Sequence, residues 1–342
     1  MMKHLHILFE HSGDQLPHGC SMVRLLRPLT YPGLSTPWRV TQGTALPEDA
    51  TPDIVVVERL WKPETDVQNA LDLIRTLRRA GSRIIYTLDD DLLGLNLPPA
   101  RANAVRMFAR FADGVIVSTE PLAGRMRSLN SNVLVVPNQI DDTLFGPPRE
   151  PRDAGEVVTM GYMGTLTHLN DLLSILEPLR RALHEQKGKL RLELVGVSEN
   201  PHVLELFNGL PVELKKADGH VAYDRFVPWV KQNLQWDFAL APLAPSAVNE
   251  CKSDLKFLDY GALSIPGVFS ASTTYSDTVR HNENGLLAAN ADEWCSNIKL
   301  MAQDADMRRR LALAARDEVY SQRCLKHRAQ DWVAAIERCI EK

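Results

Sequence analysis

Runs of apolar residues rich in Ile, Val and Leu alternate with amphipathic stretches of helical periodicity, and this alternation constrains the fold more than any other feature. Short strands of this kind, regularly separated by helices, form a parallel, doubly wound sheet with helices on both faces. The sequence therefore predicts an α/β protein. The predicted strands are HLHILFE, WRVTQ, DIVVVER, RIIYTL, GVIVST and NVLVVPN in the first half, and VVTMGYMG, LRLELVG, VELKKA, WDFALAPL, GVFS and GLLAA in the second.

The alternation is interrupted between Asn138 and Gly155, where three prolines and mixed charges are typical of a connecting segment. Because 342 residues exceed what one hydrophobic core ordinarily organises, we expect two domains. The expected ranges are 1–145 and 156–320, two tandem Rossmann-like doubly wound domains that face a central cleft, followed by a helical segment over 321–342. The connecting segment is predicted to act as a hinge.

Composition excludes several classes of protein. A formal net charge of −4 and an isoelectric point near 6.2 provide no basic field for nucleic acid. The five cysteines are odd in number and lack paired CxxC spacing, which argues against a disulfide framework or structural zinc and favours the reducing cytoplasm. No apolar run approaches the twenty residues of a membrane span, and the first residues do not read as a signal peptide.

The stretch from Asn249 to Ser270, NECKSDLKFLDYGALSIPGVFS, combines charges with a predicted helix and strand. Ser253 is a good N-cap, so the helix is predicted to begin near Asp254. Residues Lys252, Lys256 and Asp259 have helical spacing and are expected on one face. Lysines beside the start of a helix favour binding of an anion, and a carboxylate further along favours binding of hydroxyl groups. A nucleotide has both, since its phosphates are anionic and its ribose carries hydroxyl groups. The alternative is a solvated helix face.

This stretch resembles the donor-binding segment of retaining glycosyltransferases with the GT-B fold, the group 1 or family 4 enzymes, in a form similar to N..KS..K..EY.A.G.P. The resemblance implies that Asp259 holds the donor ribose and that Lys252, Ser253 and Lys256 bind its phosphates. It also implies a C-terminal helix that crosses back to the first domain. The usual family form has two glutamates separated by seven residues; here Cys251 stands at the first position and Glu250 one place early.

Other segments resemble the same family in order and spacing. They are VVPNQIDDTLF, GYMGTLTHLNDL, DGHVAYDRFVPWV and DTVRHNENGLLAA. The resemblance implies that Gly164 and Thr165 face the donor diphosphate and that His168 lines the donor side of the cleft as a catalytic candidate. A glycine turn between strand and helix also suits a phosphate on physical grounds, although plain turns favour glycine too. Tyr223 is a candidate for stacking on the nucleobase, with a core tyrosine as the alternative.

Three acids, Asp89 to Asp91, follow the strand RIIYTL. Such a run can hold a hard cation with a diphosphate, as in the DxD sites of the other glycosyltransferase fold. Because lysines already line the expected phosphate site, we expect no metal and no cofactor. Asp89 and Asp90 are instead candidates for a general base or a hydroxyl-orienting group on the acceptor side. The alternative is helix capping and strand-end solvation.

The loop after the first strand supplies the other acceptor candidates. Its residues Gly19, Ser21 and Arg24 resemble the family's glycine-containing acceptor loop, and Glu58 ends the third strand at the same edge of the sheet. Ordinary turn residues are the alternative. Arginines on the first-domain helices suggest peripheral contact with an anionic membrane, and solvated helix surfaces are the alternative.

The sequence thus predicts a glycosyltransferase that moves a sugar from a UDP, GDP or TDP sugar to a glycan, a lipid-linked glycan or another hydroxyl acceptor. The resemblance implies retention of configuration. Two alternatives remain open: a non-transferring nucleotide-sugar enzyme such as an epimerase, and a catalytically silent sugar-nucleotide-binding or partner-binding module.

Overall fold

The computed structural model describes residues 2–153, 155–197, 202–219 and 222–341. Contacts divide the chain into two compact units. The first unit contains the chain up to Asp141, the segment Glu250–Ser253 and the chain from Cys324 onward, and the second contains Asp142–Asn249 and Asp254–Arg323. Both units are discontinuous in sequence, and the expected ranges did not assign Glu250–Ser253 to the first unit.

The first unit is built on a six-stranded sheet in which all described pairs are parallel, in the order β2-β1-β3-β4-β5-β6. The central strands are rich in β-branched and other apolar residues, most of them buried on both faces, as expected where helices cover a parallel sheet. The strands are β1 (Lys3–Leu8), β2 (Trp38–Gly43), β3 (Ile54–Glu58), β4 (Arg83–Leu88), β5 (Gly114–Val117) and β6 (Val133–Val135).

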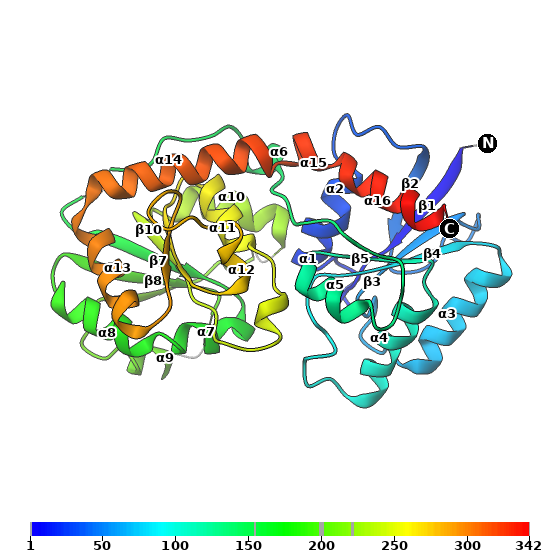
Figure 1. Ribbon diagram of the computed structural model, residues 1–342, viewed down its shortest axis with the longest axis horizontal. Helices are drawn as coiled ribbons and strands as arrows, with labels where there is room; N and C mark the ends of the chain where they lie inside the picture. Colours follow the sequence, from blue (N-terminus) through cyan, green and yellow to red (C-terminus); the bar gives the residue numbers. More distant parts are fainter. Residues whose placement is uncertain (1, 154, 198–201, 220–221, 342) are drawn as a thin grey trace. The chain divides into compact units, whose positions relative to one another are not determined.

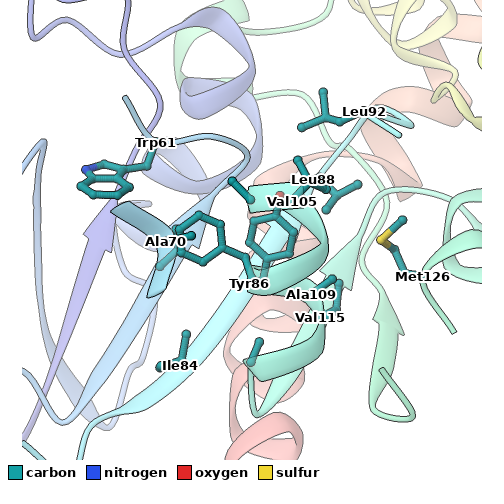
Figure 2. Packing of buried hydrophobic residues seen from close by; sticks show 14 of the residues in the cluster. Trp61, Ala70, Ile84, Tyr86, Leu88, Leu92, Val105, Ala109, Val115 and Met126 are labelled. Atoms are coloured by element: carbon teal, nitrogen blue, oxygen red, sulfur yellow. The ribbon is translucent and has the colours of Figure 1, made fainter. Parts of the chain in front are cut away.

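One face of this sheet packs against α3 (Val67–Arg79) and α4 (Pro99–Phe111). Helix α3 begins where the Asp66 carboxylate accepts the backbone N–H of Asn69 at 2.8 Å, and its buried residues recur with helical spacing. Figure 2 shows the resulting core, in which the rings of Tyr86 and Phe108 stack with centroids 5.5 Å apart. The helix α5 (Glu120–Met126) contributes Met126 to the same cluster.

The other face of the first sheet is covered from both ends of the chain. The helical segments η1 (Met22–Leu26) and α2 (Arg27–Leu29), which continue from α1 (Gly19–Ser21), pack there with α16 (Gln330–Ile340), which follows α15 (Leu325–Arg328). Helix α16 buries Trp332, Val333, Ile336 and Cys339 in this core. This confirms the predicted return of the C-terminal helix to the first domain.

The second unit repeats the plan with the order β12-β11-β10-β7-β8-β9, again with parallel pairs. Its strands are β7 (Val158–Met163), β8 (Leu190–Val195), β9 (Val212–Lys215), β10 (Phe238–Ala241), β11 (Gly267–Ser270) and β12 (Leu286–Ala288). Its helical segments are α6 (Asp142–Phe145), η2 (Leu166–His168), α7 (Leu169–Leu173), α8 (Leu176–Glu185), α9 (His202–Glu205), α10 (Tyr223–Asn233), α11 (Leu255–Ala262), α12 (Thr273–Ser276), α13 (Ala291–Gln303) and α14 (Ala305–Gln322); η3 (Asn249–Cys251) runs from this unit into the segment counted with the first.

A glycine inside β7 permits the closest packing in this unit. A Cβ atom on Gly161 would lie 1.8 Å from the nearest atom of the Trp236 ring. The indole is buried, and its Nε1–H donates to Glu193 Oε2 at 2.9 Å. Only glycine therefore lets the indole lie directly on the strand.

The helical connection between β7 and β8 is interrupted: it consists of two helices, α7 and α8, which are separated at Ser174 and Ile175. The connecting segment is not free, because the carbonyl of Arg149 accepts Ser264 Oγ–H at 2.7 Å and a guanidinium N–H of Arg316 at 3.0 Å. Residues after Asp141 therefore pack as part of the second unit.

The arginines expected to make a basic surface are partly neutralised. Arg78 and Arg83 both bind the Asp113 carboxylate at 2.9 Å, and Arg24 is only 2% exposed. Arg24 therefore cannot belong to a membrane-facing surface, contrary to the expectation. Among the described helices, none combines the length and the apolar character that crossing a bilayer requires.

Candidate functional site

In the second unit, candidate residues gather where the chain leaves β7. The next strand approaches this turn closely: the N–H of Gly164 donates to the Val195 carbonyl at 3.0 Å. Gly196 has φ +74°, and a Cβ there would lie 2.4 Å from the Gly164 carbonyl oxygen. A Cβ on Gly164 itself would approach His168 Cβ to 3.0 Å. The tight turn leads into η2, where the hydroxyls of Thr165 and Thr167 lie 2.8 Å apart.

His168 is fixed by a buried carboxylate that was not among the predicted site residues. Its Nδ1 lies 2.8 Å from Asp171 Oδ2, and Asp171 is only 4% exposed. The second oxygen, Asp171 Oδ1, accepts the N–H of Ala244 and the Nδ2–H of Asn249, each at 2.9 Å. Asp171 thereby joins the turn after β7 to the segment after β10.

Lys256 lies close to the same turn. Its Nζ is 5.6 Å from the centroid of the Tyr162 ring, near the outer limit for a cation–π contact. The Tyr162 hydroxyl in turn donates to the carbonyl of His168 at 3.2 Å. Tyr162 therefore contacts both Lys256 and the His168 turn, and burial raises its pKa, so the ring stays neutral.

Asp259 follows Lys256 by one turn of α11, as the sequence predicts. Its Oδ1 atom is buried and has no hydrogen-bond partner. Burial raises the pKa of the Asp259 carboxyl to about 7, against a smaller opposite effect of the Lys256 charge. Burying an acceptor without a donor costs free energy. The unpaired Oδ1 therefore indicates that a ligand supplies a hydroxyl or N–H donor at this position.

The start of α11 corrects the prediction for its cap. The helix begins at Leu255, which confirms the predicted start near Asp254. Ser253 does not cap it: Asp254 is at the N-cap position, and Ser253 Oγ accepts Asn138 Nδ2–H at 2.7 Å. Lys252 precedes the helix and does not share its face with Lys256. Glu250, Lys252 and Ser253 are counted with the first unit, whereas Lys256 and Asp259 belong to the second.

Cys251, at the position of the family's first acid, is buried in the core of the first unit. Its carbonyl accepts the Thr119 hydroxyl at 2.8 Å. Glu250 precedes it on η3 and is exposed. Tyr223 is the half-buried first residue of α10, an element separate from those around His168 and Lys256.

In the first unit, the acceptor candidates meet at the carboxyl ends of β1, β3 and β4. Glu58 is 1% exposed; its Oε2 accepts the Ser21 hydroxyl and, at 2.9 Å, the N–H of Glu10. Its other oxygen is buried without a partner, and burial raises the pKa of Glu58 to about 7. Gly19 is exposed, and a Cβ there would meet open space.

Arg59 binds the neighbouring acids and holds them together. No residue at this edge of the first sheet was predicted from the sequence to have this role. It has φ +46°, and its Nη1 donates to Asp89 Oδ1 at 2.8 Å and Asp90 Oδ2 at 2.9 Å. Its Nε donates to Glu10 Oε2 at 2.7 Å. Burial and the Asp90 charge raise the pKa of Asp89, while Arg59 opposes this shift.

Arg24 lies beneath this cluster. One guanidinium nitrogen donates to the carbonyl of Val136 and to Asn138 Oδ1, and the guanidinium lies 4.7 Å from the Trp332 ring centroid. Its Nε and Nη2 are buried without partners, and burial lowers the pKa of Arg24 to about 10. The side chain braces the interior of the unit, and its predicted place among the acceptor-binding residues stays a prediction.

The triple aspartate is not arranged as a set of metal ligands. Asp89 and Asp90 bind Arg59, and Asp91 Oδ1 accepts the N–H of Gly94 at 3.1 Å. Within the described ranges, the grouped donors close enough for one ion are Glu10, His18 and Cys20, all within 4.8 Å. The Glu10 carboxylate of that group already binds Arg59.

Comparison with known proteins gives structural matches only. The chain matches no protein-family profile and no curated protein sequence. The crystal structure of Anabaena HepE in complex with UDP and glucose has a TM-score of 0.68 and 13% sequence identity, covering 98% of this chain and all of that one. Sucrose-phosphate synthase from Thermosynechococcus elongatus has a TM-score of 0.60 at 15% identity, covering 84% of this chain and 74% of that chain.

The crystal structure of TarM has a TM-score of 0.62 at 11% identity and covers 83% of this chain, which spans about half, 54%, of the TarM chain. At such identities the likeness concerns the fold. Together with the two parallel sheets, it confirms the predicted fold class: this chain has the GT-B architecture, in which two Rossmann-like units are built from one polypeptide.

Proposed function

We propose that the protein is a glycosyltransferase that moves a sugar from a nucleoside-diphosphate sugar to a hydroxyl acceptor. The donor site lies in the second unit and the acceptor site in the first. Structures of the same fold support this proposal, since HepE has been crystallised with UDP-glucose. The single observation that carries it is the pair on α11: Lys256, a cation, one turn before Asp259, whose buried Oδ1 has no partner.

A nucleotide can satisfy both side chains. A ribose hydroxyl that donates to Asp259 Oδ1 would supply the missing hydrogen bond and stabilise the ionised carboxylate. Lys256, one turn earlier, is suited to the diphosphate. The glycine turn at Gly164 permits close approach of phosphate oxygens to the backbone, as in other strand-to-helix phosphate sites.

Transfer requires the sugar to leave the diphosphate, whose bridging oxygen gains negative charge in the transition state. Lys256, aided by the turn after β7, stabilises that charge without a metal ion. The acceptor hydroxyl is oriented by the carboxylates at the edge of the first sheet, Glu58 and Asp89, whose raised pKa values suit them to accept a proton. Retention of configuration is part of the proposal and rests on the family resemblance.

A thermal-shift screen with UDP, GDP, TDP and CDP, followed by a donor-hydrolysis assay, tests this proposal. One diphosphate is expected to stabilise the protein, by about 2.7 kcal/mol at a hundred times its Kd, and its sugar derivative to be hydrolysed slowly. A rearranged sugar nucleotide would instead identify an epimerase. Binding without turnover would identify a silent module, an outcome consistent with Cys251 at the position of the first acid.

A further inference from the structure

We infer that Asp171 is a positioning residue that holds His168 as an imidazolium, so that its Nε2–H serves as a second cationic donor to the donor diphosphate beside Lys256. The inference rests on the proposed function and adds to it a residue that was not among the predicted site residues. Diphosphate binding at the donor site then depends on the protonation of His168.

The geometry of Asp171 supports a single ionised state. Its carboxylate is buried, and both oxygens accept hydrogen bonds: Oδ1 from the N–H groups of Ala244 and Asn249, and Oδ2 from His168 Nδ1. A carboxylate that accepts several N–H groups is strongly stabilised in the charged form. A buried charge is tolerated when it is paired, and His168 is its ion-pair partner at 2.8 Å.

This arrangement determines what the other ring nitrogen can do. With Nδ1–H donated to Asp171, a neutral ring would present a lone pair at Nε2, which repels phosphate oxygens. The imidazolium presents Nε2–H, a charge-assisted donor to an anion. Asp171 favours that protonated form because opposite charges in contact stabilise each other.

The other ionisable groups near the ring do not reverse this effect. Tyr162, on β7, donates its hydroxyl to the His168 carbonyl and is kept neutral by burial. Lys256, on α11, opposes protonation of the ring, and its Nζ lies 5.6 Å from the centroid of the Tyr162 ring. Asn249, on η3, contacts Asp171 and carries no charge. Asp171, in direct contact, therefore has the largest effect.

Histidine-selective NMR of the full chain tests the inference, with His168→Gln used to assign the resonance. Asp171→Asn is expected to lower the titration midpoint of His168 by about one pH unit. The conservative Asp171→Glu variant is expected to restore it. A matched control is Thr274→Val, which removes the hydroxyl bonded to the Asn249 carbonyl at 2.7 Å and leaves His168–Asp171 intact. If Asp171→Asn does not fold, Asp171→Ser replaces it.

Inorganic pyrophosphate supplies the second readout, since it carries the diphosphate chemistry without a base or sugar. It is expected to raise the His168 midpoint in the parent protein and to have a smaller effect in Asp171→Asn. An unchanged midpoint in every Asp171 variant, or no response to pyrophosphate, overturns the inference. Failure of the proposed function is distinguishable, because it is a lack of stabilisation by all four nucleoside diphosphates.

Discussion

Lys256 is the residue with the sharpest expected effect on the reaction. Replacing it with alanine removes the charge that we propose stabilises the leaving diphosphate, so kcat should fall on the order of a hundredfold or more. Steady-state kinetics with the donor identified by thermal shift provide the measurement. Lys299→Ala is a matched control, because Lys299 on α13 pairs with Glu185 away from the donor cluster. An equal loss in both variants would contradict a specific role for Lys256.

Asp259→Asn should weaken donor binding and stabilise the free protein. The donor affinity should fall by roughly 1–3 kcal/mol, because a carboxylate that accepts hydroxyl groups loses its charge. The pKa of Asp259 is raised from its usual 3.8 to about 7 by burial, so between these pH values the folded protein keeps a proton that the unfolded chain has lost. Its contribution to stability therefore falls as pH rises through this window.

The variant should consequently be more stable than the parent at pH 8, by on the order of 1–3 kcal/mol, and nearly equal to it at pH 4. Calorimetric titration and urea unfolding at the two pH values measure both effects. A variant that binds the donor normally and is less stable at pH 8 would show that Asp259 is an ordinary structural residue.

Spacing in the sequence was sufficient to pair Lys256 with Asp259, because residues three apart are neighbours on one face of a helix. Spacing did not predict the contact of Ser253, whose hydroxyl oxygen accepts a hydrogen bond from Asn138, 115 residues away, instead of capping the helix. Asp171 was missed for the same reason, since its partners Ala244 and Asn249 are 73 and 78 residues away. Contacts of this range depend on the register of strands, which local pattern does not encode.

Strand β7 illustrates a constraint that acts on a whole element. Gly161→Ala would place a methyl group within 1.8 Å of the Trp236 ring, so the indole or the strand must move. Overpacking of this kind should destabilise the second unit by about 1–3 kcal/mol or more. Gly124→Ala, in α5 with open space around the new Cβ, is the control and should be neutral or slightly stabilising. Urea denaturation distinguishes the two, and equal stabilities would contradict the packing argument.

Among the elements, strands were more predictable than helices. Runs such as Ile54–Glu58 are buried on both faces, so their composition alone marks them. The break between α7 and α8 was not visible in the apolar periodicity, because Leu172, Ile175 and Leu179 are buried on both sides of it. The contacts of the connecting segment were likewise not visible in sequence, because Arg149 and Glu150 bind residues more than a hundred positions later.

For the molecule as a whole, we expect transfer activity to survive chelation by EDTA. The reason is that, in the proposed function, Lys256 and the turn after β7 would stabilise the diphosphate, while Arg59 binds Asp89 and Asp90. Activity assays with EDTA, followed by addition of magnesium or manganese, are the measurement. Complete loss that either ion restores would place Asp89 to Asp91 in a metal site.

The discontinuous first unit leads to a second expectation at this scale. Trp332→Ala removes a side chain that is 1% exposed and packed on the Arg24 guanidinium, which should cost about 3–5 kcal/mol. Hydrogen exchange should accelerate in β1, β4 and β5 of the first unit, although residue 332 is far from them in sequence. Faster exchange confined to the second unit would be inconsistent with this assignment of α16.

The same discontinuity affects how the protein is made. The ribosome must synthesise the second unit before it reaches α16, and at about 5–20 residues per second this takes roughly 10–40 s. During that interval the first sheet lacks Trp332, Val333 and Ile336, so an apolar face remains uncovered. The nascent chain is therefore a natural client for a chaperone that shields its early half. Slowing translation should lengthen that dependence rather than relieve it.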